Sequence, residues 1–232
     1  MKSKRILGVI PARGGSKGIK NKNIIDLDGS PLISHTIKAG LKSTMLTDCI
    51  VSTDSEAIKN IAEEFGANVP FKRPDELSSD LALPLPVMQH AVKFMEKLRN
   101  YDYDAVVMLQ PTTPLRLSDD IDKSLELLFE TNADSVISVV VIEANHPFRM
   151  KRIIDGRLVN YIDQGYEDMR PRQVLPPVYI RNGAIYATKR DILINTNSFT
   201  GNDVRAYVMP AERSVNIDSM KDYIIAKNYF NK

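Results

Sequence analysis

Several kinds of residue are scarce in this 232-residue chain, and each scarcity excludes a class of protein. Cys49 is its one cysteine, so no internal disulfide can form, and a reducing cytoplasm is the expected setting. The three histidines are scattered and have no spacing typical of a zinc site. The net charge is only +2, which gives no basic field for nucleic acid. No apolar run approaches the roughly 18 residues of a membrane span, so no membrane partner is expected.

Several familiar signatures are also missing. The chain has no Walker A loop, no G-x-G-x-x-G fingerprint and no recognisable Ser-His-Asp nucleophile motif. Its basic start is followed by a short apolar run, residues 6–10, that ends at Pro11. This run is expected to be a first strand rather than a signal peptide. Cys49 precedes a strand-like run, which favours a buried, inert thiol.

What is present is a regular alternation of strand and helix patterns. Apolar runs predict strands at residues 6–10, 49–52, 68–71, 105–109, 135–142 and 182–187. Helical spacing predicts helices at 31–42, 55–65, 85–98 and 118–129. Such alternation favours one α/β domain over residues 1–232, an open, mostly parallel sheet with helices on both faces. In sheets of this kind, ligands bind beyond the carboxyl ends of the strands.

The alternation stops between residues 148 and 177. Residues 151–159 read as a hairpin that turns at Asp155-Gly156. An excursion of this kind is typically a lid, a substrate loop or a dimer arm. We therefore expect 148–177 to be an inserted dimer or substrate arm.

The loop after the first strand predicts a phosphate site. Between Pro11 and Asn23 it carries three glycines and four cations. Glycines let backbone N–H groups approach a ligand, and successive free N–H groups form a site for an anion. Asp54, at the end of the second strand, leaves two interpretations open: it binds a ribose hydroxyl or a basic group of this loop, or it caps the helix that starts near Ser55.

Four motifs together resemble the acylneuraminate cytidylyltransferases. The first is Ala12-Arg13-x-x-Ser16-Lys17-Gly18 followed by Lys22-Asn23. The second, residues 109–116, reads L-Q-P-T-T-P-L-R, nearly the family's L-Q-P-T-S-P-L-R. Residues 171–176 and 182–186 are similar to the P-R-Q-x-L-P and N-G-A-I-Y block, and 73–80 to R-P-x-x-L-x-x-D. The resemblance extends from about residue 6 to 218, including Val215-Asn216-Ile217-Asp218.

The resemblance implies a Rossmann-like nucleotidyltransferase fold, a homodimer and a reaction. Enzymes of this family join CTP to a nine-carbon 2-keto acid sugar, release pyrophosphate and use Mg²⁺. The triphosphate would be held by Arg13, Ser16, Lys17, Lys22 and Asn23. Catalysis would rest on Arg13, Lys22 and Asp218, and Asp218 with Asn216 would hold the metal. A strand over residues 215–218 would place these two side chains on the same face, so that both point at one ion.

The remaining implied roles concern the base and the sugar. Cytosine would be read by Arg73 and by backbone groups near Ala82. Gln110, on a loop fixed by two prolines, can offer donors and an acceptor to a polyhydroxylated sugar. Arg172 suits a carboxylate because its guanidinium binds bidentately, and Arg181 is a second candidate. The family places a basic residue of the excursion, here Arg149 or Lys151, in a neighbouring subunit's site.

Three departures from the family's pattern bear on these roles. The metal motif has Asn216 where the family has an aspartate, Pro84 replaces a small hydroxyl residue, and Arg181 lies one position later than the family's arginine. We expect Arg116 to be structural and to tie its loop down.

Alternative substrates and one alternative class stay open. Legionaminic or pseudaminic acid could replace the sialic acid, although pseudaminate enzymes tend to read S-K-R-I-P where this chain has S-K-G-I-K. The alternative from another class is a catalytically silent nucleotide-binding domain, which the change at Asn216 would favour.

Overall fold

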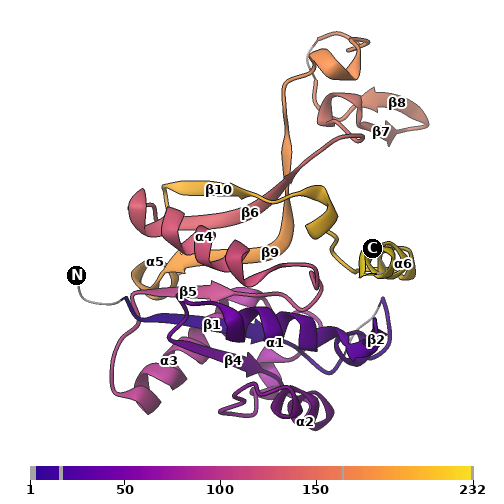
Figure 1. The fold of residues 1–232 in the computed structure, drawn as a ribbon. Coiled ribbons are helices and arrows are strands. Elements are labelled where there is room, and N and C mark those ends of the chain that lie inside the picture. The colour runs from indigo at the N-terminus through magenta and orange to yellow at the C-terminus, as the bar shows by residue number, and fades with distance from the viewer. Residues whose placement is uncertain (1–3, 16–17, 164, 231–232) are drawn as a thin grey trace.

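A six-stranded sheet forms the body of the protein in a computed structural model that describes residues 4–15, 18–163 and 165–230 (Figure 1). Its strand order is β10 (Val204–Val208), β6 (Ser135–Val141), β9 (Tyr179–Lys189), β5 (Ala105–Met108), β1 (Ile6–Pro11) and β4 (Asp48–Ser52). Only β9 is antiparallel to its neighbours, β5 and β6. The sheet is therefore mostly parallel, as the sequence predicts.

Helices cover both faces of the sheet because its central strands are apolar on both sides. Along β1, Ile6 and Ile10 pack with α1 (Leu32–Lys42), α2 (Glu56–Glu64) and α4 (Ser118–Glu130). Leu7 and Val9 point the other way and pack with α3 (Pro84–Arg99) and α5 (Arg190–Ile194). This alternation is the period-two pattern of a strand buried on both faces. Cys49 lies among these core contacts, and burial raises its pKa to about 12, as expected of an inert thiol.

Two predicted strands are wrong, and one strand and two α-helices after residue 187 were not predicted. Residues 68–71 form only isolated bridges, Ile50 to Asn68 and Thr53 to Lys72, and residues 215–218 form an extended loop. The unpredicted elements are β10, α5 and α6 (Met220–Phe230). β10 is a largely exposed edge strand, and α6 buries only Ala226, so neither carries a clear apolar period.

An arm projects from the body between β6 and β9 (Figure 1). It carries a hairpin of β7 (Lys151–Ile154) and β8 (Arg157–Asn160), which turns at Asp155 and Gly156 as predicted. Many apolar side chains of the arm are exposed, among them Ile153 at 75%, Leu158 at 69% and Met169 at 80%. A small pair, β2 (Asp26–Leu27) and β3 (Ser30–Pro31), precedes α1. Among the described residues, no helix is long and apolar enough to cross a membrane.

Candidate active site

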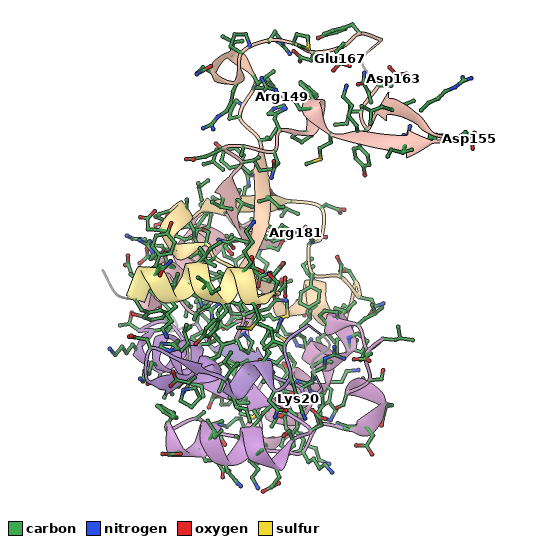
Figure 2. All side chains as sticks on the ribbon, turned by 90° about the vertical axis from the view of Figure 1, so that its right-hand side faces the viewer. Lys20, Arg149, Asp155, Asp163, Glu167 and Arg181 are labelled. Carbon is green, nitrogen blue, oxygen red and sulfur yellow. The ribbon has the colours of Figure 1, made fainter. Side chains whose placement is uncertain are left out.

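A cavity of about 480 Å³ lies at the carboxyl ends of β1 and β5. Figure 2 looks at the protein from the side of this edge, with the arm above the body. The cavity brings together eight of the residues that the sequence singles out: Arg13, Lys22, Asn23, Arg73, Ala82, Gln110, Asn216 and Asp218. They come from four separate stretches of the chain, so folding gathers them at the place where parallel sheets bind ligands.

Side chains around the glycine-rich loop form hydrogen bonds with its backbone. Asp54 Oδ1 accepts a hydrogen bond from the Gly14 N–H at 2.9 Å, and Asn23 Nδ2 donates to the Arg13 carbonyl at 3.0 Å. Ser55 rather than Asp54 caps α2, through its hydroxyl and the Ile58 N–H at 3.4 Å. Asp54 thus braces the loop through a backbone N–H, which neither interpretation from the sequence anticipated. Asn23 also shapes the loop, in addition to lining the cavity.

Arg13 reaches across the cavity from this loop. Its Nη1 donates to the Ser79 carbonyl at 3.1 Å and to Asp80 Oδ1 at 2.7 Å. Ser79 and Ala82 line the cavity beside it. The guanidinium is partly exposed, with 31% of the side chain accessible, so it can exchange these contacts for those of an anionic ligand.

Arg73 is buried beside the end of β4, so it is not a plain surface residue. Its Nε donates to Ser52 Oγ at 3.1 Å, and its Nη2 donates to the Ser52 carbonyl. Burial lowers the pKa of Arg73 to about 10, and the nearby Asp54 opposes this shift. The guanidinium therefore stays charged at neutral pH and brings a fixed cation to the cavity wall.

Gln110 and Arg116 belong to one rigid loop. Arg116 is fully buried and donates to Thr113, Thr36, and the carbonyls of Gln110 and Ala184. These bonds tie the loop to α1 and β9, which agrees with the structural role predicted for Arg116. Gly183, at φ +79°, gives Gln110 its room, because a Cβ there would lie 2.7 Å from Gln110 Oε1.

Asn216 and Asp218 meet across an extended loop. Asn216 Nδ2 donates to Asp218 Oδ2 at 2.8 Å, and Lys22 Nζ donates to Asp218 Oδ1 at 3.0 Å. Lys22 also donates to the Ile217 carbonyl at 2.9 Å. The backbone passes very close to the glycine-rich loop here, since a Cβ on Gly18 would lie 2.6 Å from the Asp218 carbonyl. The predicted pairing of the two side chains is present, although no strand produces it.

The donors of this pair fit Mg²⁺, a hard cation that prefers oxygen. Asn216 Oδ1 is buried without a hydrogen-bond partner, and the Asp218 carboxylate stands beside it at the cavity. No cluster of three or more His, Cys, Asp or Glu side chains suited to a metal occurs among the described residues. One carboxylate and one amide match the way Mg²⁺ is usually held in phosphate sites, where phosphates and waters complete the shell.

Two predicted sugar ligands lie outside the cavity. Arg172 is exposed on the arm, in a short 3-10 helix (Arg172–Val174), and Arg181 is exposed on β9 where that strand approaches the arm (Figure 2). Arg149 Nη2 donates to the Arg170 carbonyl, and Lys151 pairs with Glu167, so both are engaged within the arm. The remaining predicted residues, Ser16 and Lys17, lie outside the described part of the chain.

Three apolar side chains, Leu77, Val87 and Met108, also line the cavity. Leu77 belongs to the R-P-x-x-L-x-x-D motif over residues 73–80, whereas Val87 and Met108 were not predicted as part of a site. Val87 was predicted only on the apolar face of the helix over 85–98, and Met108 only within the buried strand over 105–109. An apolar core pattern does not show which of its residues border a cavity, so the sequence held no separate signal for these two.

The chain matches known proteins over nearly its whole length. A sequence model of the family described as cytidylyltransferase matches residues 7–222. An N-acylneuraminate cytidylyltransferase of Escherichia coli is 34% identical over 96% of the chain, which spans 51% of that protein. A CMP-N,N'-diacetyllegionaminic acid synthase of Legionella pneumophila is 32% identical over 96% of the chain and 95% of that protein.

A likeness of fold accompanies these matches. The solved structure of a CMP:2-keto-3-deoxy-manno-octonic acid synthetase complexed with CTP superposes with a TM-score of 0.71 at 18% identity. The superposition covers 98% of this chain and 99% of that one.

Proposed function

Because the chain belongs to the cytidylyltransferase family, we propose that it joins CTP to a nine-carbon 2-keto acid sugar and releases pyrophosphate. The anomeric hydroxyl oxygen of the sugar would form a bond to the α-phosphorus of CTP. The bond from that phosphorus to the pyrophosphate oxygen would break, and the hydroxyl proton would be released. The cavity carries this proposal, since it gathers three cations, a carboxylate and three amide side chains at one edge of the sheet.

CTP would bind at the glycine-rich loop, through its backbone and through the side chains of Arg13, Lys22 and Asn23. Arg13 and Lys22 are the cations suited to the triphosphate, and Asn23 holds the loop in shape through the Arg13 carbonyl. The cytosine would lie toward Arg73 and Ala82, where the apolar wall can cover one face of the ring. Charge neutralisation and positioning are the main ways in which proteins speed transfer at phosphorus.

Mg²⁺ would be held by Asp218 and Asn216 together with the triphosphate. When bound, the ion would neutralise charge on the phosphate oxygens. Lys22 Nζ, which pairs with the Asp218 carboxylate and lines the cavity, would then turn to the phosphates. The Asp218 carboxylate would then pair with Mg²⁺ in place of the Lys22 ammonium group.

The acid sugar would meet Gln110 in the cavity and Arg172 across a dimer. Arg172 does not line the cavity of its own chain and stands on an arm with exposed apolar side chains. Burying such side chains is favourable by about 25 cal/mol per Å². A second copy of the chain is therefore the proposed partner of the arm, and Arg172 would reach the partner's cavity.

A panel of acid sugars tests this function. Pyrophosphate release should be slow with CTP alone and should rise at least 100-fold with N-acetylneuraminate or N,N'-diacetyllegionaminate. The first is an N-acylneuraminate, the class in the name of one relative, and the second is in the name of another. Pseudaminate and an eight-carbon 2-keto acid complete the panel. Release that no acid sugar stimulates would contradict the proposal and favour a silent nucleotide-binding domain.

A further inference from the structure

The loop that carries Asn216 and Asp218 is anchored at several points outside the cavity. We call residues 214–218 the metal segment, since the proposed function places Mg²⁺ there. Ser214 Oγ accepts a hydrogen bond from Asn182 Nδ2 at 2.9 Å, and the Ile217 N–H donates to the Thr112 carbonyl at 2.8 Å. Ile217 is fully buried, so the residues on either side of it are turned toward the cavity.

The strongest anchor lies at the start of this segment. Arg213 immediately precedes Ser214 and binds Asp120 of α4 with two parallel hydrogen bonds. Its Nη2 lies 2.7 Å from Asp120 Oδ1, and its Nε lies 3.2 Å from Oδ2. The Asp120 carboxylate is completely buried. Bidentate pairs of this kind fix direction as well as distance, because both groups are planar.

Asp120 also holds the loop that carries Gln110. Its Oδ2 accepts a hydrogen bond from the Leu117 N–H at 2.9 Å, at the point where that loop enters α4. Tyr207 of β10 donates its hydroxyl to Oδ1 at 3.0 Å. One buried carboxylate therefore joins two loops that border the cavity from opposite ends of the sequence. Neither Asp120 nor Arg213 lines the cavity itself.

We propose that Asp120 and Arg213 are positioning residues for the transfer reaction: they set where Asn216 and Asp218 stand relative to Gln110 and the nucleotide. Mg²⁺ demands nearly ideal octahedral geometry, so a small displacement of the metal segment weakens its binding. This inference rests on the proposed function and adds to it a pair of residues that touches neither substrate nor metal.

The direction of the change in cation binding distinguishes a positioning role of Arg213 from an effect of its charge. Arg213→Gln removes a positive charge near the metal segment, which by electrostatics alone would strengthen the binding of a cation. Loss of position would weaken it. Arg213→Lys keeps the charge but cannot form the bidentate pair, so here too only a loss of position would weaken binding.

The experiment measures Mn²⁺ binding to the CTP complex by electron paramagnetic resonance, with Mn²⁺ as the probe for Mg²⁺. Both Arg213 variants should bind Mn²⁺ at least five-fold more weakly than wild type. CTP binding measured in EDTA should stay within two-fold of wild type in both. The control is Arg190→Lys, which breaks a similar bidentate pair with Glu96. Arg190 Nε lies 3.0 Å from Glu96 Oε1 and Nη2 lies 3.1 Å from Oε2, near the amino end of β5 and away from the cavity.

Each outcome decides. Weaker Mn²⁺ binding in both folded Arg213 variants, with no change in Arg190→Lys, supports the positioning role. Unchanged or stronger Mn²⁺ binding in either Arg213 variant overturns it. An equal loss in the Arg190→Lys control also overturns it, because the effect would then come from lost stability. Wild-type protein that binds no Mn²⁺ with CTP would instead contradict the proposed function itself.

Discussion

Lys22 and Asp218 form an ion pair at the cavity, with 3.0 Å between Nζ and Oδ1. The pair joins the cation proposed for the triphosphate to the carboxylate proposed for the metal. It brings together the first loop of the protein and the segment before its last helix, which are far apart in the sequence.

This pair predicts opposite effects on two ligands. Lys22→Met should lower kcat/KM for CTP by about 100-fold, the usual scale for one lost electrostatic contact to a reacting group. The same change should raise Mn²⁺ affinity in the absence of CTP, because Asp218 loses its competing cation. Steady-state kinetics and Mn²⁺ titration check the two effects, and normal kcat/KM would show that Lys22 only ties the two loops together.

A preference for CTP is expected from Arg73 and Ala82, which line the cavity where the cytosine would lie. CTP should exceed UTP, ATP and GTP by at least tenfold in kcat/KM, which needs only about 1.4 kcal/mol, the scale of one hydrogen bond. Parallel assays with each nucleotide and one acid sugar measure the ratio. Equal rates with CTP and UTP would contradict the recognition of cytosine by the residues around Arg73 and Ala82.

The sugar carboxylate is tested at Arg172. Arg172→Lys keeps the charge but loses the bidentate fork, so the KM of the acid sugar should rise several-fold while that of CTP stays nearly constant. Arg157→Lys, an exposed arginine on β8 of the same arm, is the matched control. An unchanged sugar KM would move the carboxylate site elsewhere, with Arg181 the next residue to test.

The departure at Asn216 predicts a weaker metal site than an aspartate would give. Asn216→Asp adds a carboxylate beside Asp218 and should lower the Mg²⁺ concentration for half-maximal rate, while Asp218→Ala should nearly abolish turnover. A Mg²⁺ titration of the initial rate measures both. Superimposable titrations for wild type and Asn216→Asp would show that Asn216 serves only to hydrogen-bond Asp218.

Acid stability should depend on Asp48, at the start of β4. Its burial raises the pKa, but hydrogen bonds from Tyr103, Tyr101 and Arg99 outweigh burial and bring the pKa below the ordinary 3.8. A depressed pKa stabilises the fold above the unfolded value, and this stability is lost as pH falls. The loss of stability in Asp48→Asn should therefore be largest above about pH 5 and shrink below pH 4. Urea unfolding across this range measures it, and a pH-independent difference would contradict the assignment.

Sequence patterns predicted those parts of the fold that have an apolar period. The first strand and the amphipathic helices are present because each buries its apolar side chains in the core. The hairpin is present because Asp155-Gly156 favours a tight turn. The antiparallel course of β9 was not predicted, because it depends on how the chain returns from the arm. β10 was missed because most of its residues are exposed.

Many residues of the cavity were predicted from motifs, but the hydrogen bonds that hold them in place were not. The motifs pointed to Arg13, Lys22 and Asp218, which the structure gathers in one cavity. The hydrogen bonds from Gly14 to Asp54 and from Arg213 to Asp120 join residues 40 and 93 positions apart. Contacts at such separations arise from tertiary packing, so no local sequence pattern predicts them.

Product analysis tests the central claim most directly. Wild-type protein, CTP, Mg²⁺ and an acid sugar from the panel should give, in ³¹P NMR, one phosphodiester signal of a CMP-sugar and an equal amount of pyrophosphate. CMP with pyrophosphate but no phosphodiester would mean that water, not the sugar, attacks the α-phosphorus. That result, or CTP left intact with every acid sugar, would contradict the account.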